Sequence, residues 1–424
     1  MPNEQPLFSI LIPTTGRADL FRMATRSILE QTCSDWELVI ADSSGSDSAR
    51  AAAAASGDRR IRYVVVPPGR GPLAPWDYAA SQARGTYVLW LDDDNYLLPF
   101  ALDLFSKAIA ETSADIVTAN HLYYYDDRHP RRFLRNVIGV VPYTGERKTI
   151  DVRAALRAIY AFERRGAGSA FPRFHFSATV IARRVVEAAF SRLGFVMIDD
   201  MPNIHSLQPI VFAFAKSGFS VDHPVVIIGR LGVSMSQTWS TAARGRFRRR
   251  PFVAKLSPVT GYARINGTLE NFLRVQELLP DLLGDMPVNY ERFAELYLAE
   301  LALLDTGAGT AVRNWKNLFA FLQTLSPAAQ GRLVPAAHHL ALRAPLVYLS
   351  RRTGLHHVWR TLNGWRIARR ERRRDFRAAI RGNAEFAVPI DPRYGVTSVE
   401  TLALHLRDIL FEATGRDIFA IPGR

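Results

Sequence analysis

The chain has 424 residues, an apolar content of 48%, and a net charge of +14 from 54 Lys and Arg against 40 Asp and Glu. This length predicts two domains, and the absence of an apolar run of about 18 residues excludes a membrane-spanning helix. The lone Cys33 excludes an internal disulfide, and residues 1–5 lack the basic and apolar regions of a signal peptide, so we expect a cytoplasmic location.

Strand and helix patterns alternate through the N-terminal part of the chain. They predict strands over 8–12, 36–41 and 61–66, a helix over 17–31 and an alanine-rich helix after Asp42. This alternation predicts a parallel sheet with right-handed crossovers.

Three consecutive carboxylates, Asp92, Asp93 and Asp94, follow the apolar run 87–91 directly. The run predicts a buried strand, and carboxylates crowded at its end favour a hard divalent cation such as Mg²⁺ or Mn²⁺. Asp42 also ends a strand, so it should face the same crevice, where α/β sheets bind their ligands. The alternative is an acidic turn that caps a helix over 100–112.

Four sequence blocks, in this order and spacing, resemble family 2 glycosyltransferases of the GT-A fold. They are 9–14, 28–32, 36–43 and 83–94, the last followed by Pro99. The resemblance is clear over roughly 7–110 and fainter to about 235. It implies a Rossmann-like, mostly parallel central sheet flanked by helices over residues 1–240.

The resemblance further implies metal-dependent, inverting transfer from a nucleotide-diphosphate sugar, most commonly a UDP-sugar. Asp92 and Asp94 match the acidic ends of the family's Asp-X-Asp motif, with Asp94 as the main ligand of Mg²⁺ or Mn²⁺. Asp92 or Asp93 would hold ribose or sugar hydroxyls. Ser43 and Asn95 depart from the pattern, because aspartate is usual at both positions.

The nucleotide would lie on the first two strand ends. Thr14 and Asp42 occupy positions that contact the base and ribose in the family. The neighbouring Pro13, Thr15 and Arg17 belong to the same predicted donor site. Trp76, before the acidic strand, is expected either to stack on a base or sugar ring or to pack in the core.

Transfer also needs a general base for the acceptor hydroxyl. The family places it just before a helix that ends in Gly-aromatic, here 207–217, but its usual carboxylate does not align. Asp200 is the preferred candidate and His205 the second, with Asp199 behind them. The alternatives are a polar turn before Pro202 and a capping or core role for His205.

His175, between two phenylalanines and before an expected strand over 178–182, is a further candidate near the acceptor, although a structural role is the commoner one for such a residue.

Two arginine clusters, 244–250 and 366–374, carry much of the positive charge. The first predicts a basic mobile loop or linker over 241–268 that could meet a diphosphate or an anionic lipid. The second, with Trp359 and Trp365, resembles a basic amphipathic helix at an anionic membrane surface, and a solvated helix face is the alternative. No nucleic-acid motif accompanies either cluster.

Apolar residues at helical spacing dominate the rest of the chain. They cover 290–304, 313–325, 328–343 and 348–381, and no strong strand pattern interrupts them. We therefore expect a helical domain over 269–424 that contacts the acceptor, the inner membrane face or another subunit.

The resemblance implies a glycosyltransferase of glycan or polysaccharide assembly that acts on a glycan or lipid-linked acceptor. A nucleotidyltransferase is one alternative, but residues 14–17 are too short for its phosphate loop. A catalytically impaired sugar-binding module on the same fold is the other, because the base is displaced.

Overall fold

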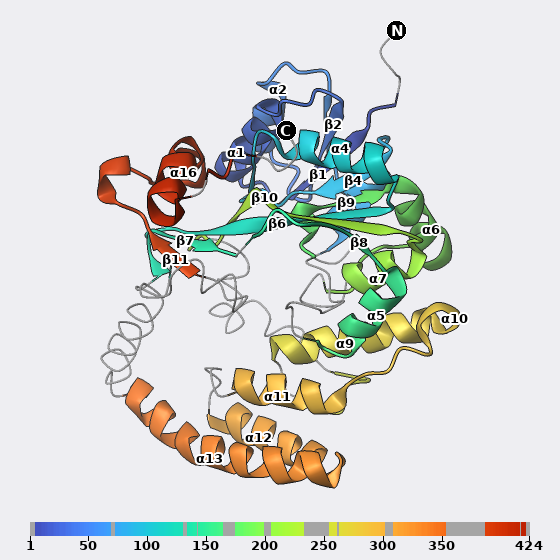
Figure 1. Cartoon of the computed structure of the whole chain (residues 1–424), viewed down its shortest axis with the longest axis vertical. Coiled ribbons are helices and arrows are strands. Elements are labelled where there is room, and N and C mark those ends of the chain that lie inside the picture. Colours follow the sequence, from blue (N-terminus) through green and yellow to red (C-terminus); the bar gives the residue numbers. More distant parts are fainter. Residues whose placement is uncertain are drawn as a thin grey trace.

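The computed structural model is shown in Figure 1. It describes residues 5–68, 73–129, 134–141, 143–163, 174–198, 205–232, 254–260, 263–301, 308–352, 386–415 and 417–420. Asp199, Asp200 and both arginine clusters lie outside the described residues.

Four parallel strands form one half of a large sheet, as the sequence predicts. They are β1 (Phe8–Thr14), β2 (Trp36–Asp42), β3 (Ile61–Val65) and β4 (Tyr87–Trp90), in the order β4-β1-β2-β3. β1 and β2 are buried along their whole length, which explains their nearly continuous apolar sequences. Thr14 pairs with Asp42, so the two strand ends lie side by side.

The other half of the sheet mixes both strand directions. Its long parallel pair is β6 (Ile116–Tyr125) and β10 (Gly218–Gly229), and the antiparallel β9 (Thr179–Ala182) joins β6 to β4. Three short strands add antiparallel pairs: β5 (Tyr96–Leu97) and β8 (Arg147–Ile150) on β10, and β7 (Val137–Val140) on β6. The predicted central sheet with parallel strands is confirmed: the sheet is mixed, and parallel strands form its centre.

Helices cover both faces of this sheet (Figure 1). They are α1 (Ala18–Leu29), α2 (Asp47–Ala54), α3 (Ala74–Ser81), α4 (Ala101–Thr112), α5 (Val152–Tyr160), α6 (Arg183–Leu193) and α7 (Leu207–Phe214). In this view α4 lies above the sheet, and α5 and α7 lie below it. The main core therefore forms between the sheet and these helices.

A chain of helices follows below the sheet, as expected (Figure 1). Its members are α9 (Arg264–Leu278), α10 (Pro280–Leu283), α11 (Tyr290–Leu301), α12 (Ala308–Leu322) and α13 (Pro327–Arg352). In the part of the chain that the structure describes, no helix is long and apolar enough to cross a membrane.

The helical domain expected over 269–424 also contains a strand. β11 (Phe386–Pro389) pairs antiparallel with β7 and becomes an edge strand of the sheet. Four residues are too few to show an alternating pattern, and the partner strand lies far away in sequence, so local reasoning misses it.

The C-terminal helix α16 (Val399–Thr414) packs with β11 on the sheet. Leu402, Leu406 and Leu410 join a second core cluster that contains Tyr124 of β6, and the His223 ring of β10 bonds to the Ile418 carbonyl oxygen at 2.8 Å. Residues 386–420 thus belong to the sheet in space, although the helical chain precedes them in sequence.

Candidate active site

The acidic triplet forms a tight turn directly after β4. The Asn95 N–H donates to the Asp92 carbonyl at 3.0 Å and closes the turn. The side chains of Asp93 and Asp94 are buried, at 2% and 7% exposure. Asp92 is partly exposed, but its Oδ1 atom is buried and has no hydrogen-bond partner among the described residues.

The middle carboxylate, Asp93, is bound by two residues from the end of β1. Thr14 Oγ1 donates to Asp93 Oδ2 at 3.0 Å, and Arg17 Nε donates to the same oxygen at 3.1 Å. Arg17 also donates to the second oxygen through Nη2, so the guanidinium binds the carboxylate in a bidentate manner. The structure therefore joins three predicted donor-site residues in one contact.

Burial and mutual repulsion act on the triplet. Burial raises the pKa of Asp92 well above its usual range, the charges of Asp94 and Asp93 raise it further, and Arg17 opposes them. Burial likewise raises the pKa of Asp93 to about 6, although the Arg17 charge lowers it. The turn thus holds more negative charge than a buried site accommodates easily, and a cation would stabilise it.

The donor atoms fit a hard cation that shares its coordination with a phosphate ligand. Among the described residues, no group of three or more His, Cys, Asp or Glu side chains is placed to hold a metal ion alone. Mg²⁺ is commonly bound by one or two carboxylates plus substrate phosphates, and the partnerless Asp92 Oδ1 suits that arrangement.

Asp42, at the end of β2, is fully buried and bound by neutral donors. Its Oδ1 accepts the Ser44 N–H at 2.8 Å, and its Oδ2 accepts the Tyr63 hydroxyl at 2.6 Å. Burial and this carboxylate together raise the pKa of Tyr63 to about 12, so the phenol stays a donor. Gly16 has a φ of +82°, and an added Cβ would lie 2.4 Å from Ser44 Oγ, so this turn requires glycine.

The remaining predicted donor-site residues differ in their exposure to solvent. Pro13 is buried in β1 opposite Ala41, and Thr15 is exposed in the following turn. Trp76 is 7% exposed and belongs to the main core, which favours the packing alternative over ring stacking. Its indole N–H lies close enough to the Asp92 carboxylate to lower the pKa of that group.

Asn95 ties the acidic turn to the other half of the sheet. It is fully buried, and its Nδ2 donates to Ser177 Oγ at 3.0 Å while its Oδ1 accepts the Gly229 N–H at 3.1 Å. A Cβ at Gly229 would lie 2.2 Å from the Asp94 carbonyl oxygen. Sequence reasoning noted Asn95 only as a departure from a pattern and missed Gly229, because nothing local indicates this distant contact.

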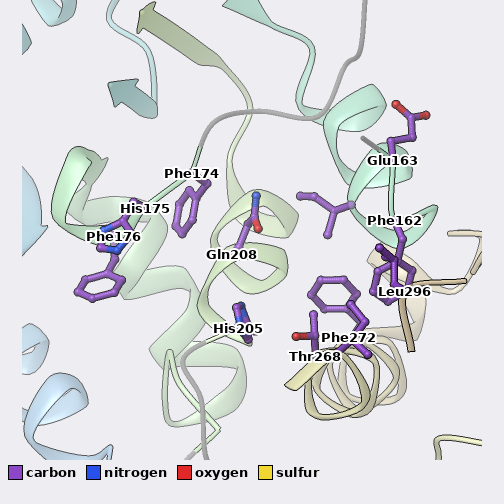
Figure 2. Close-up of a pocket in the computed structure, with 12 residues that line it drawn as sticks. Phe162, Glu163, Phe174, His175, Phe176, His205, Gln208, Thr268, Phe272 and Leu296 are labelled. Atoms are coloured by element: carbon purple, nitrogen blue, oxygen red, sulfur yellow. The ribbon is translucent and has the colours of Figure 1, made fainter. Parts of the chain in front are cut away.

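Both candidate histidines line one cavity of about 290 Å³ between the sheet domain and α9. Figure 2 shows His175 and Phe174 on one side, Thr268 and Phe272 on the other, and His205 between them. The His175 Nδ1 accepts the Ser177 N–H at 3.2 Å, so the proton of the neutral ring is on Nε2. His175 therefore presents a donor, whereas His205 remains a candidate base.

The segment before His205 is held at its two ends. Asp77, which sequence reasoning missed, accepts the Val196 and Met197 N–H groups at 3.0 and 3.1 Å. The Ile198 N–H donates to Ser206 Oγ at 3.0 Å. These bonds fix residues 198 and 206 beside each other and bring His205 to the cavity.

Comparisons with known proteins find similarity to glycosyltransferases. Residues 9–178 match the family model "Glycosyl transferase family 2". The chain is 31% identical over 114 residues to the Campylobacter jejuni GalNAc(5)-diNAcBac-PP-undecaprenol beta-1,3-glucosyltransferase, covering 26% of this chain and 37% of the relative. It is 24% identical over 115 residues to the Escherichia coli UDP-Glc:alpha-D-GlcNAc-diphosphoundecaprenol beta-1,3-glucosyltransferase WfgD, covering 27% of this chain and 46% of that protein.

Among solved structures, S. aureus TarS 1–349 in complex with UDP-GlcNAc aligns with 14% identity and a TM-score of 0.49, over 82% of this chain and 92% of that one. The chain spans less than half the length of the two curated relatives. Residues 9–178, which contain the acidic turn and Asp42, are the part of the chain that is similar to glycosyltransferase family 2.

Proposed function

We propose that the chain transfers a sugar from a nucleotide-diphosphate sugar, a UDP-sugar, to an acceptor hydroxyl with inversion, in the assembly of a glycan or polysaccharide. The observation that carries the proposal is the buried carboxylate turn beside Asp42, at the carboxyl edge of the parallel strands of a family 2 domain. The name of WfgD supports UDP as the nucleotide.

On the donor side, Asp94 and Asp92 would hold Mg²⁺ or Mn²⁺ together with the diphosphate oxygens. Such a cation, when bound, stabilises the negative charge that builds on the leaving diphosphate. Arg17 Nη1 is buried without a hydrogen-bond partner among the described residues, so it can donate to a phosphate oxygen. Asp93 holds the Arg17 guanidinium in place, and Asp42 and Thr14 meet the ribose and base.

On the acceptor side, the cavity at His205 receives the hydroxyl that attacks. A general base must take the proton of that hydroxyl as the new bond forms. His205 lines the cavity, and Asp200, which lies outside the described residues, is the other candidate. His175 donates through Nε2 and orients an acceptor oxygen rather than deprotonating it.

A thermal-shift panel tests the donor site most directly. UDP with Mn²⁺ should raise the melting temperature more than UDP or Mn²⁺ alone, because a ligand that binds only the folded state stabilises it. Asp94→Asn should abolish the shift, and Asp19→Asn, at a side chain 90% exposed, should keep it. An unchanged shift in Asp94→Asn contradicts the assignment. A normal shift without release of UDP from any UDP-sugar indicates a binding module instead.

The acceptor is proposed to be lipid-linked, as the name of WfgD states for that relative. Arg366 to Arg374, outside the described residues, supply the cations for an anionic membrane surface. Each cation there contributes about 1 kcal/mol. Replacing Arg369, Arg370, Arg372 and Arg373 by Ser should abolish binding to phosphatidylserine liposomes, and salt should weaken the wild type. If the wild-type protein does not bind these liposomes at low salt, this part of the proposal is wrong.

A further inference from the structure

Five aromatic rings form a continuous row from the cavity along β6. His175 lies 5.1 Å from His121, and His121 lies 4.8 Å from Tyr123, measured between ring centroids. The row continues to Tyr125 at 6.2 Å and ends at His129, a further 5.1 Å away. We call these five residues the aromatic row.

The row lies on one face of β6 because alternate residues of a strand point to the same side. Residues 121, 123 and 125 share that face, whereas Leu122 and Tyr124 on the other face are fully buried in the second core cluster. Tyr123 and Tyr125 are half-buried. Two large rings of the row thus keep part of their surface in contact with solvent, while their neighbours stabilise the fold.

The row is continuous with the proposed acceptor cavity. His175 belongs to both, since it lines the cavity and its ring packs against His121. The residue two positions later, Ser177, bonds to Asn95 beside the metal-binding carboxylates. The row therefore begins beside the cavity, and beyond the buried His121 the half-buried Tyr123 and Tyr125 continue it along β6.

The chemistry of the row suits a chain of sugar rings. A pyranose presents a face of C–H groups with partial positive charge, and an aromatic face carries partial negative charge. Tyrosine adds a hydroxyl that both donates and accepts, as sugar hydroxyls do. The Arg230 guanidinium lies 4.8 Å over the Tyr123 ring and fixes its orientation, so little rotamer freedom is lost on binding.

We propose that the aromatic row is an acceptor subsite that binds an oligosaccharide, whose successive rings stack on Tyr123 and Tyr125. The inference rests on the proposed function and deepens it, because it makes the acceptor a chain of several sugars rather than a single sugar.

Saccharide binding by the whole chain tests the proposal. Isothermal titration would use hexasaccharides of β-1,3-linked glucose, of N-acetylglucosamine and of hyaluronan, each compared with its own monosaccharides. The wild type should bind at least one hexasaccharide more tightly than its monosaccharides. Tyr123→Ala and Tyr125→Ala should each weaken that binding by about three- to tenfold, and Tyr123→Phe and Tyr125→Phe should retain most of it because the ring face remains.

The thermal shift with UDP and Mn²⁺ serves as the separate readout. All four variants should keep it, which also shows that they fold. Tyr290→Ala, at a 37% exposed tyrosine of α11, is the matched control and should bind saccharide normally. No binding of any hexasaccharide by the wild type, or equal binding by the alanine variants, overturns the subsite. If UDP with Mn²⁺ does not raise the melting temperature of the wild type, the proposed function is overturned instead.

Discussion

The acidic turn after β4 and the aromatic row on β6 belong to one sheet but hold their side chains in opposite ways. The turn crowds three carboxylates, and burial raises the pKa of Asp92 and Asp93. The row is made of rings that pack edge to face and stay half-buried at Tyr123 and Tyr125. The first arrangement would gain from a bound metal ion, whereas in the second the Arg230 guanidinium already lies over the Tyr123 ring.

In the proposed function, the acidic turn and the aromatic row let one sheet bind two substrates of unlike chemistry. A nucleotide-diphosphate sugar would be recognised by charge, through Arg17 and a cation held by the carboxylates. A neutral saccharide would be recognised by shape and ring stacking. Asn95 joins the two regions because it bonds to Ser177 and Gly229 from within the acidic turn.

The largest expected effect is a loss of turnover when a carboxylate of the acidic turn is neutralised, while the aromatic row is left unchanged. Asp94→Asn removes a carboxylate that we propose as a cation ligand, and we expect turnover of the UDP-sugar to fall at least about a hundredfold. Saccharide binding on the aromatic row should not change. Steady-state release of UDP and calorimetry with a hexasaccharide measure the two effects. Near-normal turnover that still requires Mn²⁺ would show that Asp94 is not a ligand.

A second substitution probes the cavity where the regions meet. His205→Ala should lower kcat about a hundredfold and leave the KM for the donor unchanged, since deprotonation matters only in the transition state. His339→Ala, at an exposed histidine of α13, is the control. Asp200→Asn is the parallel variant, and the larger loss of kcat identifies the base. Normal rates in both variants place the base elsewhere.

The sequence predicts the acidic turn far better than the aromatic row. The turn is local: three carboxylates directly follow an apolar strand, and Asp42 ends the neighbouring strand, so the sheet brings them together. The pairing of Arg17 and Thr14 with Asp93 needed the structure, because it depends on side-chain reach across two strand ends.

The aromatic row could not be predicted from the sequence, and the reason is physical. Tyr123, Tyr124 and Tyr125 form one apolar run, and the run alone does not tell which tyrosine faces the core. Only the packing of α16 and the second core cluster against one face of β6 assigns Tyr124 to the buried side. β11 could not be predicted for a similar reason, because its partner strand β7 is far away in sequence.

A third prediction concerns the link between the regions. Asn95→Asp restores the acid that is common in the family but adds a fourth carboxylate to a fully buried position. Without metal, the free energy of unfolding should fall by about 1–3 kcal/mol, since an added buried charge lacks compensation. Urea unfolding measures this, and UDP with Mn²⁺ should recover part of the loss.

Asn289→Asp is the matched control for this variant. Asn289 is exposed and its Oδ1 accepts the Arg292 N–H at 2.9 Å at the start of α11, where a carboxylate is tolerated or favourable. Its unfolding free energy should change little. Equal stability of Asn95→Asp and the wild type without metal would mean that the turn accommodates charge more easily than its burial indicates.

The smallest effect concerns the core behind the aromatic row. His223 of β10 packs against Phe100 and Tyr143 of the second core cluster, and its Nε2–H donates to the Ile418 carbonyl. Burial lowers the pKa of His223 below its usual value. The neutral ring is therefore the folded form, and the unfolded chain binds the proton first as the pH falls through about 6.5. Stability should decrease from there towards the lowered pKa.

His223→Gln isolates this contribution, because an amide N–H can still donate to the Ile418 carbonyl but does not titrate. Melting temperatures of both proteins between pH 7.5 and about 5 should diverge, with the wild type losing more as the pH falls. The other histidines are the same in both proteins, so their titration cancels in the difference. Parallel curves would show that His223 does not link the C-terminal segment to pH. Diverging curves would show that the core behind the row responds to acid through His223.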